Sequence, residues 1–83
     1  MPTVREFTNR MWYAQKILII KWQDFDMIGW GIREVENGLE AAKKKAVYVG
    51  TPHELRSEVY ADVNKMTIDS YGTMEDTLII EVY

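Results

Sequence analysis

Apolar and polar residues repeat with a helical period at the start of the chain. Thr3-Val4-Arg5-Glu6 has the sequence of a capping box, in which the threonine hydroxyl and the glutamate carboxylate each accept a backbone N–H from the other residue. Apolar residues then recur at the i, i+3, i+7 and i+8 spacing of one helical face. They are Val4, Phe7, Met11 and Trp12. We expect a helix over residues 4–13 with Trp12 packed in the core.

Two segments that follow have the composition of β-strands. Residues 16–22 form a β-branched apolar run bracketed by lysines, which predicts an interior strand with both faces apolar. Residues 27–34 alternate apolar side chains with glycine and arginine, and two aspartates before them supply turn chemistry. The pattern therefore predicts a hairpin.

The second half of the chain alternates short helical and strand patterns. Residues 38–45 are mostly strong helix formers with acid early and base late, which predicts a short helix, and residues 46–49 predict a brief strand. Thr51-Pro52-His53-Glu54 is a second capping-box sequence that predicts one helical turn from Pro52. Residues 63–71 and 77–83 predict two strands joined by a longer hairpin loop over residues 72–76.

Together these elements predict one α+β domain spanning residues 1–83. We expect an N-terminal helix packed on a mostly antiparallel sheet of about four strands, with a short second helix. A chain of 83 residues has the bulk of one domain, and the absence of cysteine excludes disulfides and fits a reducing compartment. No apolar run approaches the roughly 18 residues of a membrane span. We therefore expect a cytoplasmic protein that does not bind membranes.

Charge is distributed unevenly along the chain. Residues 1–45 carry eight Lys/Arg and six Asp/Glu, a net +2, whereas residues 46–83 carry two and seven, a net −5. The acidic second half argues against nucleic-acid binding and suggests a negative field around the C-terminal hairpin. Alternatively, these acids only keep the protein soluble.

Sequence motifs for catalysis, metal binding or cofactor binding are absent. His53 is the only histidine, and it falls in the first turn of a predicted helix, where a neutral imidazole facing water is favoured. The pairs Asp24-x-Asp26 and Glu34-x-Glu36 lack the further oxygen ligands of a calcium loop. The five glycines match no phosphate-binding spacing. We therefore expect no enzyme activity, no metal site and no cofactor.

Aromatic residues make up 12% of the chain, which is more than so small an interior can hide. In the two C-terminal strands, Tyr71, Ile79 and Tyr83 are predicted to share the face opposite the core positions. Apolar side chains beside acids are typical of protein interfaces. The candidate partner-binding residues are Tyr71, Glu75, Asp76, Ile79, Glu81, Tyr83 and Trp30. A homodimer would use the same patch by pairing the C-terminal strand, taken as a sheet edge.

Several motifs carry a resemblance to a known group of proteins. They are the turn Tyr48-x-Gly50-Thr51-Pro52-x-x-Leu55, the ending Leu78-Ile79-Ile80-Glu81-Val82 and the opening Thr3-Val4-x-Glu6-Phe7. With them the chain resembles small uncharacterised proteins of prophages and mobile elements in Gram-positive bacteria, and residues 38–45 are an extra segment relative to simpler members. The resemblance implies no catalytic residues. It implies a genomic setting in which small acidic proteins block host defence nucleases.

These observations favour a non-enzymatic protein-binding module encoded by a phage or mobile element. The specific expectation is an inhibitor of a bacterial defence complex, such as an anti-CRISPR protein, whose acidic hairpin imitates nucleic-acid charge. Two alternatives stay open. One is a homo-oligomeric structural or scaffold domain, and the other is a sponge that holds a signalling nucleotide in a basic pocket between subunits near Arg33 and Lys43 to Lys45.

Overall fold

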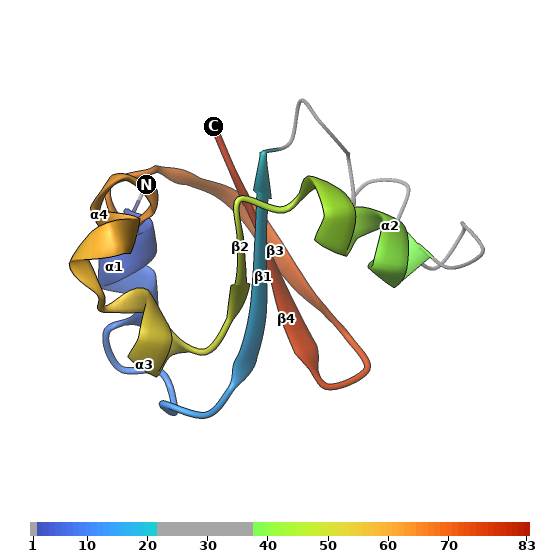
Figure 1. The fold of residues 1–83 in the computed structure, drawn as a ribbon, viewed down its shortest axis with the longest axis horizontal. Coiled ribbons are helices and arrows are strands. Elements are labelled where there is room, and N and C mark those ends of the chain that lie inside the picture. Colours follow the sequence, from blue (N-terminus) through green and yellow to red (C-terminus); the bar gives the residue numbers. More distant parts are fainter. Residues whose placement is uncertain (1, 22–37) are drawn as a thin grey trace.

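The computed structural model describes residues 2–21 and 38–83 of the chain (Figure 1). Its helices and strands are α1 (Val4–Thr8), β1 (Lys16–Lys21), α2 (Gly38–Lys45), β2 (Tyr48–Gly50), α3 (Pro52–Leu55), the 3₁₀ turn η2 (Glu58–Tyr60), α4 (Ala61–Asn64), β3 (Ile68–Met74) and β4 (Thr77–Val82). The predicted strand over residues 27–34, with Trp30, lies outside the described residues.

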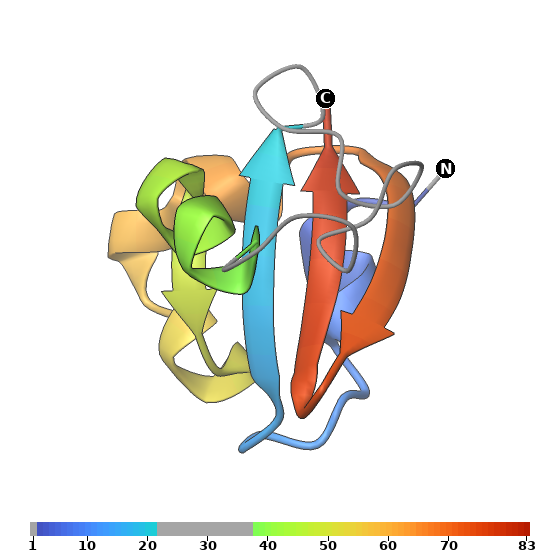
Figure 2. The same cartoon turned by 90° about the vertical axis from the view of Figure 1, so that its right-hand side faces the viewer.

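The four strands form one mixed sheet in the order β2-β1-β4-β3. The outer pairs, β1 with β2 and β3 with β4, are antiparallel, while the central pair β1 and β4 is parallel. Figure 2 shows this sheet nearly face on. The predicted α+β fold is confirmed, including its N-terminal helix, its sheet of about four strands and its second helix over Gly38–Lys45.

Helices cover both faces of the sheet. In Figure 1, α1, α3 and α4 lie on one side of the sheet and α2 lies on the other. The central strand β1 accordingly buries four consecutive side chains, Ile17 to Ile20. A strand covered on both faces needs such a continuous apolar run rather than alternation. The prediction of an interior strand at this segment is confirmed.

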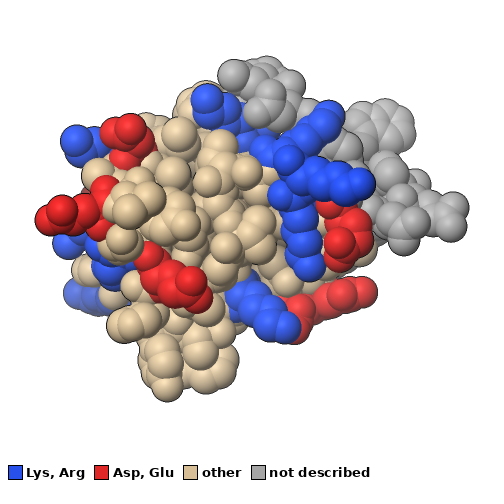
Figure 3. Space-filling view, in the orientation of Figure 1, with Lys and Arg blue, Asp and Glu red and all other residues tan. Residues whose placement is uncertain are grey.

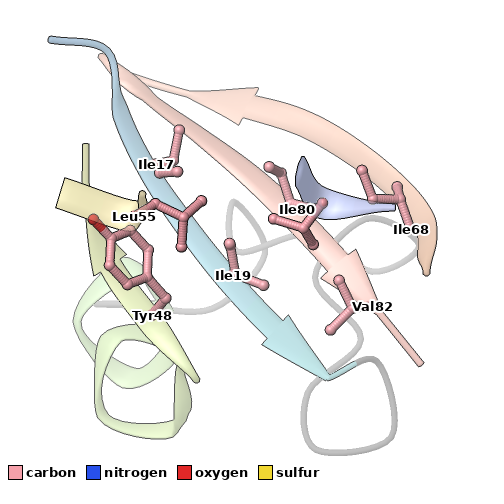
Figure 4. Close-up of a cluster of buried hydrophobic side chains, with 8 residues drawn as sticks. Ile17, Ile19, Tyr48, Leu55, Ile68, Ile80 and Val82 are labelled. Atoms are coloured by element: carbon pink, nitrogen blue, oxygen red, sulfur yellow. The ribbon is translucent and has the colours of Figure 1, made fainter. Parts of the chain in front are cut away.

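The larger core cluster lies between the sheet and α1, α3 and α4. Strand and helix side chains meet there, as Figure 4 shows for Ile17, Ile19, Tyr48, Leu55, Ile68, Ile80 and Val82. A smaller cluster on the other face joins Leu18, Ile20, Ala42 and Ile79, with Ala42 supplied by α2. Neighbouring residues of β1 and β4 therefore contribute to two separate clusters.

The N-terminal helix begins where the sequence predicts and ends earlier. Thr3 Oγ1 accepts from Glu6 N at 3.2 Å, and Glu6 Oε1 accepts from Thr3 N at 3.1 Å, which completes the capping box. The helix stops at Thr8, whose carbonyl accepts from Arg56 Nη2 at 2.9 Å. The predicted extension to residue 13 is wrong. Trp12 consequently lies outside the helix and is 67% exposed, so the prediction that it packs in the core is also wrong.

The second half departs from the predicted strand boundaries in two places. The predicted strand over residues 63–71 begins only at Ile68, because residues 61–64 form helix α4. The predicted loop over residues 72–76 is a two-residue turn, since Met74 pairs directly with Thr77. The predicted turn of helix at Pro52 is confirmed, with Thr51 Oγ1 accepting from Glu54 N at 3.4 Å.

The motif Tyr48-x-Gly50-Thr51 has a structural explanation. The Tyr48 hydroxyl donates to the carbonyl of Thr51 at 2.6 Å, and burial raises the pKa of this phenol to about 12. The ring passes over Gly50, where a Cβ atom would lie 2.6 Å from the hydroxyl oxygen. This motif therefore fixes the connection between β2 and α3.

The turn between β3 and β4 allows a stabilising substitution. Glu75 has a φ of 56°, in the left-handed region that glycine adopts without steric cost. Glu75→Gly is therefore expected to raise the free energy of unfolding by about 0.5 to 1 kcal/mol. Glu75→Ala is the control, because alanine keeps the Cβ atom, and it is expected to give no gain. Chemical denaturation checks both, and an equal gain in the two variants would contradict the strain at this position.

Candidate protein-binding surface

A groove of about 300 Å³ lies beside β3, the strand at one edge of the sheet. Its lining residues are Pro2, Phe7, Ile68, Asp69, Ser70 and Tyr71. The rings of Phe7 and Tyr71 lie 4.9 Å apart between centroids, at an interplanar angle of 46°. Tyr71 remains 58% exposed. The groove is thus an apolar depression with one large aromatic ring open to solvent.

An irregularity in β3 places Tyr71 in this groove. The pairing with β4 shifts between Ile68 and Ser70, so that Ile68 faces Val82 while Tyr71 faces Ile80. An extra residue of this kind reverses the alternation of the strand beyond it. Ile68 and Tyr71 therefore lie on the same face, toward α1. The prediction that Tyr71 shares a face with Ile79 is wrong for this reason.

The N-terminal segment already pairs with the outer side of the chain at the start of β3. Ile68 N donates to Pro2 O at 3.0 Å, and Val4 N donates to Met66 O at 2.9 Å. Thr3 and Thr67 form an antiparallel bridge between these two bonds. An extended segment is therefore accommodated beside this edge at one end of the groove.

Asp69 and Tyr83 add a polar contact near the groove. The Asp69 carboxylate raises the pKa of the Tyr83 phenol, by hydrogen bonding to it and by its negative charge. Tyr83 is more than half exposed. Through Asp69, which lines the groove, Tyr83 belongs to the same part of the surface as Tyr71.

The structure separates the other candidate residues from this edge or buries them. Ile79 is 4% exposed and belongs to the cluster under α2. Glu81 is 2% exposed. Neither side chain is available to a partner in this fold. Glu75 and Asp76 form the exposed turn after β3.

The acids after Lys65 do not gather into one exposed face. Glu81 is buried, and Asp76 forms an ion pair with Lys16 at 2.9 Å. On the face of the molecule that Figure 3 shows, acidic side chains lie scattered near its left and right ends, and basic side chains gather over α2. The middle of this face carries neither. An acidic hairpin that imitates nucleic-acid charge would need a continuous row of exposed acids. The described hairpin lacks such a row.

The ion pair of Lys16 and Asp76 gives a prediction for pH dependence. Lys16 holds the pKa of Asp76 below its ordinary value by a hydrogen bond and by its charge. A lowered folded-state pKa stabilises the protein above the unfolded-state pKa, and that contribution is lost as the pH falls through the folded-state pKa. Lys16→Met is expected to raise the pKa of Asp76, as NMR titration of its carboxyl carbon would measure.

The control for this titration is Lys44→Met, which removes an exposed lysine away from the pair. It is expected to leave the pKa of Asp76 unchanged. Added salt is expected to reduce the difference, because both partners are exposed. The same Asp76 pKa with and without Lys16 would contradict the pairing.

A second aromatic cluster, formed by Trp12, Tyr13 and His53, was not predicted from the sequence. The rings of Trp12 and Tyr13 lie 6.0 Å apart, and those of Tyr13 and His53 lie 6.4 Å apart, both with edge-on geometry. Trp12 and Tyr13 are each two-thirds exposed. The sequence signal was the pair of adjacent aromatic residues, which cannot both lie on the buried face of one helix.

The described residues offer little for metal or membrane chemistry. No three His, Asp or Glu side chains among residues 2–21 and 38–83 come together as metal ligands. Within the same ranges no helix combines the length and apolarity needed to cross a bilayer. His53 is exposed on α3 and contacts the ring of Tyr13.

No family model, no curated protein and no solved structure matches this chain.

Proposed function

We propose that the protein is a non-enzymatic protein-binding module that takes an extended segment of a partner protein along the outer edge of β3. The observation that carries the proposal is the groove beside this edge. It combines the Phe7 and Tyr71 rings, 4.9 Å apart, with an edge strand. Edge strands recruit extended peptides through their backbone groups, and side-chain pockets beside them give specificity.

The groove also restricts the chemistry of the partner segment. Its apolar walls suit an aliphatic side chain, and the exposed ring of Tyr71 is the kind of residue that contributes most to binding energy. Asp69 lines the same groove and suits a neighbouring lysine or arginine of the partner. The expected segment is therefore an extended stretch in which aliphatic and basic residues alternate.

The identity of the partner depends on the resemblance to prophage proteins. An inhibitor of a bacterial defence complex would use such an edge to occupy a protein surface. The buried Glu81 and the paired Asp76 do not support imitation of nucleic acid, so the proposed contact is made by the apolar groove. A homo-oligomeric scaffold would pair β3 with β3 of a second copy, and the test below distinguishes this case.

The test uses a fluorescent six-residue peptide in which leucine and lysine alternate, with fluorescence anisotropy as readout. Tyr71→Ala is expected to weaken binding at least about tenfold, as loss of a central aromatic contact does. The matched control is Tyr13→Ala, which removes another tyrosine that is more than half exposed, from the other aromatic cluster. A control peptide alternating serine and lysine keeps the charge and loses the apolar anchor, and it is expected to bind weakly.

Three results would overturn the proposal. The first is equal peptide affinity of wild type and Tyr71→Ala, and the second is equal affinity of the leucine and serine peptides. The third is a concentration-dependent dimer, seen by sedimentation, that Tyr71→Ala converts to a monomer. That last result would assign the edge to self-association.

A further inference from the structure

A second cavity, of about 430 Å³, lies in the helical layer and shares no lining residue with the β3 groove. Its wall includes the side chains of Arg5, Arg56 and Lys65 from three separate segments, together with Ser57, Glu58 and Asn64. Arg5 belongs to α1, Arg56 follows α3 and Lys65 follows α4. The tertiary fold thus brings Arg5 beside two cations that lie more than fifty positions later in the sequence.

The charge of this cavity is opposite to that of the protein. The chain has a net charge of −3, whereas the cavity wall carries three cations and one carboxylate. Arg56 and Lys65 are the only arginine and lysine of the acidic half, residues 46–83, and both line this cavity. Within the described residues, none of the three cations forms an ion pair with a carboxylate. The wall therefore keeps positive charge that no acid among residues 2–21 and 38–83 neutralises in an ion pair.

Hydrogen bonds hold part of this wall in place before any ligand binds. Arg56 donates from Nη1 to Thr8 Oγ1 at 3.2 Å and from Nη2 to Thr8 O at 2.9 Å. These acceptors are neutral, so the guanidinium keeps its charge and further N–H donors. A fixed cation loses less conformational entropy on binding than a free one.

Asn64, which also lines the cavity, is a buried polar residue. It is 7% exposed, and its Nδ2 donates to Leu55 O at 2.8 Å and to Tyr60 O at 3.0 Å, which fixes the orientation of the amide. Its Oδ1 is buried and accepts no hydrogen bond from the described residues. A buried acceptor without a partner is unusual and calls for a donor. The cavity wall thus combines three cations with a residue whose buried side-chain oxygen lacks a donor.

We propose that this cavity binds a small organic phosphate monoester. The phosphate oxygens would accept from the guanidinium groups and from the Lys65 ammonium, since arginine in particular matches phosphate geometry. The volume is in the range of small-molecule pockets, which leaves room for the organic group of the ester. This site is separate from the β3 groove. Phosphate binding here and peptide binding at the groove can therefore be tested independently of each other.

The test measures binding of glycerol phosphate by NMR titration at constant ionic strength, with inorganic phosphate and glycerol as comparison ligands. Arg5→Gln and Lys65→Gln are each expected to weaken binding about tenfold, the effect of one lost charge-assisted hydrogen bond. The matched controls are Arg10→Gln and Lys44→Gln, which remove exposed charges outside the cavity. Glycerol phosphate is expected to bind more tightly than inorganic phosphate, and glycerol alone is expected not to bind.

Each contrary result overturns a defined part of the proposal. Equal weakening by the control substitutions would show diffuse charge attraction in place of a site. Absence of saturable binding by both phosphates would overturn the site itself. Equal affinity for inorganic phosphate and glycerol phosphate would overturn the organic part of the ligand.

Discussion

Ile80→Ala is expected to lower the free energy of unfolding by about 3 kcal/mol, within a range of about 2 to 5 kcal/mol. Ile80 is fully buried in the central strand β4, opposite Ile19 of β1 and Tyr71 of β3. A domain of this length has a total stability of roughly 4 to 12 kcal/mol, so the loss is a large share of it. Thermal unfolding is expected to shift down by roughly 12 to 24 °C, as circular dichroism would measure.

The matched control for Ile80 is Val59→Ala, at a position that is 83% exposed. It is expected to change stability by less than about 0.5 kcal/mol. A double variant of Ile19 and Ile80 is expected to depart from additivity, because the two residues are direct neighbours across the parallel ladder. Equal stability of Ile80→Ala and Val59→Ala would contradict the central position of β4.

Asn64→Leu is expected to cost about 2 to 4 kcal/mol although it adds an apolar side chain to a buried site. The Asn64 amide donates to the carbonyls of Leu55 and Tyr60, and so connects the end of α3 to the start of α4. Leucine has a similar size and no donor, so two buried carbonyl groups would lose their hydrogen bonds. Urea denaturation of the variant gives this free energy.

Asn9→Leu serves as control, because Asn9 is exposed at the end of α1. Its expected effect is below about 0.5 kcal/mol. A stable Asn64→Leu variant would show that the two carbonyls find other donors and that Asn64 is not needed to join the helices.

Helices and strands whose position depends on nearby residues were predicted correctly from the sequence. The capping sequences at Thr3 and Thr51 mark the true starts of α1 and α3. The lysine-bracketed apolar run marks β1, and the helix formers of residues 38–45 mark α2. In each case the signal and the structure depend on residues within one or two turns of each other.

Features that depend on distant residues could not be predicted in this way. The helix α1 ends at Thr8, where Arg56 binds a carbonyl from 48 positions away. The parallel pairing of β1 with β4 joins segments that are 61 residues apart in register, from Lys16 to Thr77. The sequence around one member of each pair gives no indication of the other member.

The candidate binding site was predicted only in part, and one extra residue explains most of the difference. Period-two alternation placed Tyr71 with Ile79, but the shift in β3 between Ile68 and Ser70 reverses the faces. The same prediction treated the C-terminal strand as a sheet edge, whereas β4 lies inside the sheet and β3 forms the edge. Tyr71 and Tyr83 stay on the surface, and the contribution of Phe7 to the groove appears only in three dimensions.

The most direct measurement of the central claim is NMR of the isotope-labelled protein bound to the alternating leucine and lysine peptide. Strand addition predicts contacts between the peptide backbone and the amides of residues 69–71, beyond the Ile68 amide that Pro2 already occupies, with a leucine side chain near the rings of Phe7 and Tyr71. Contacts confined to the Trp12 and Tyr13 cluster, or contacts distributed over the whole surface, would contradict the assignment of the β3 edge.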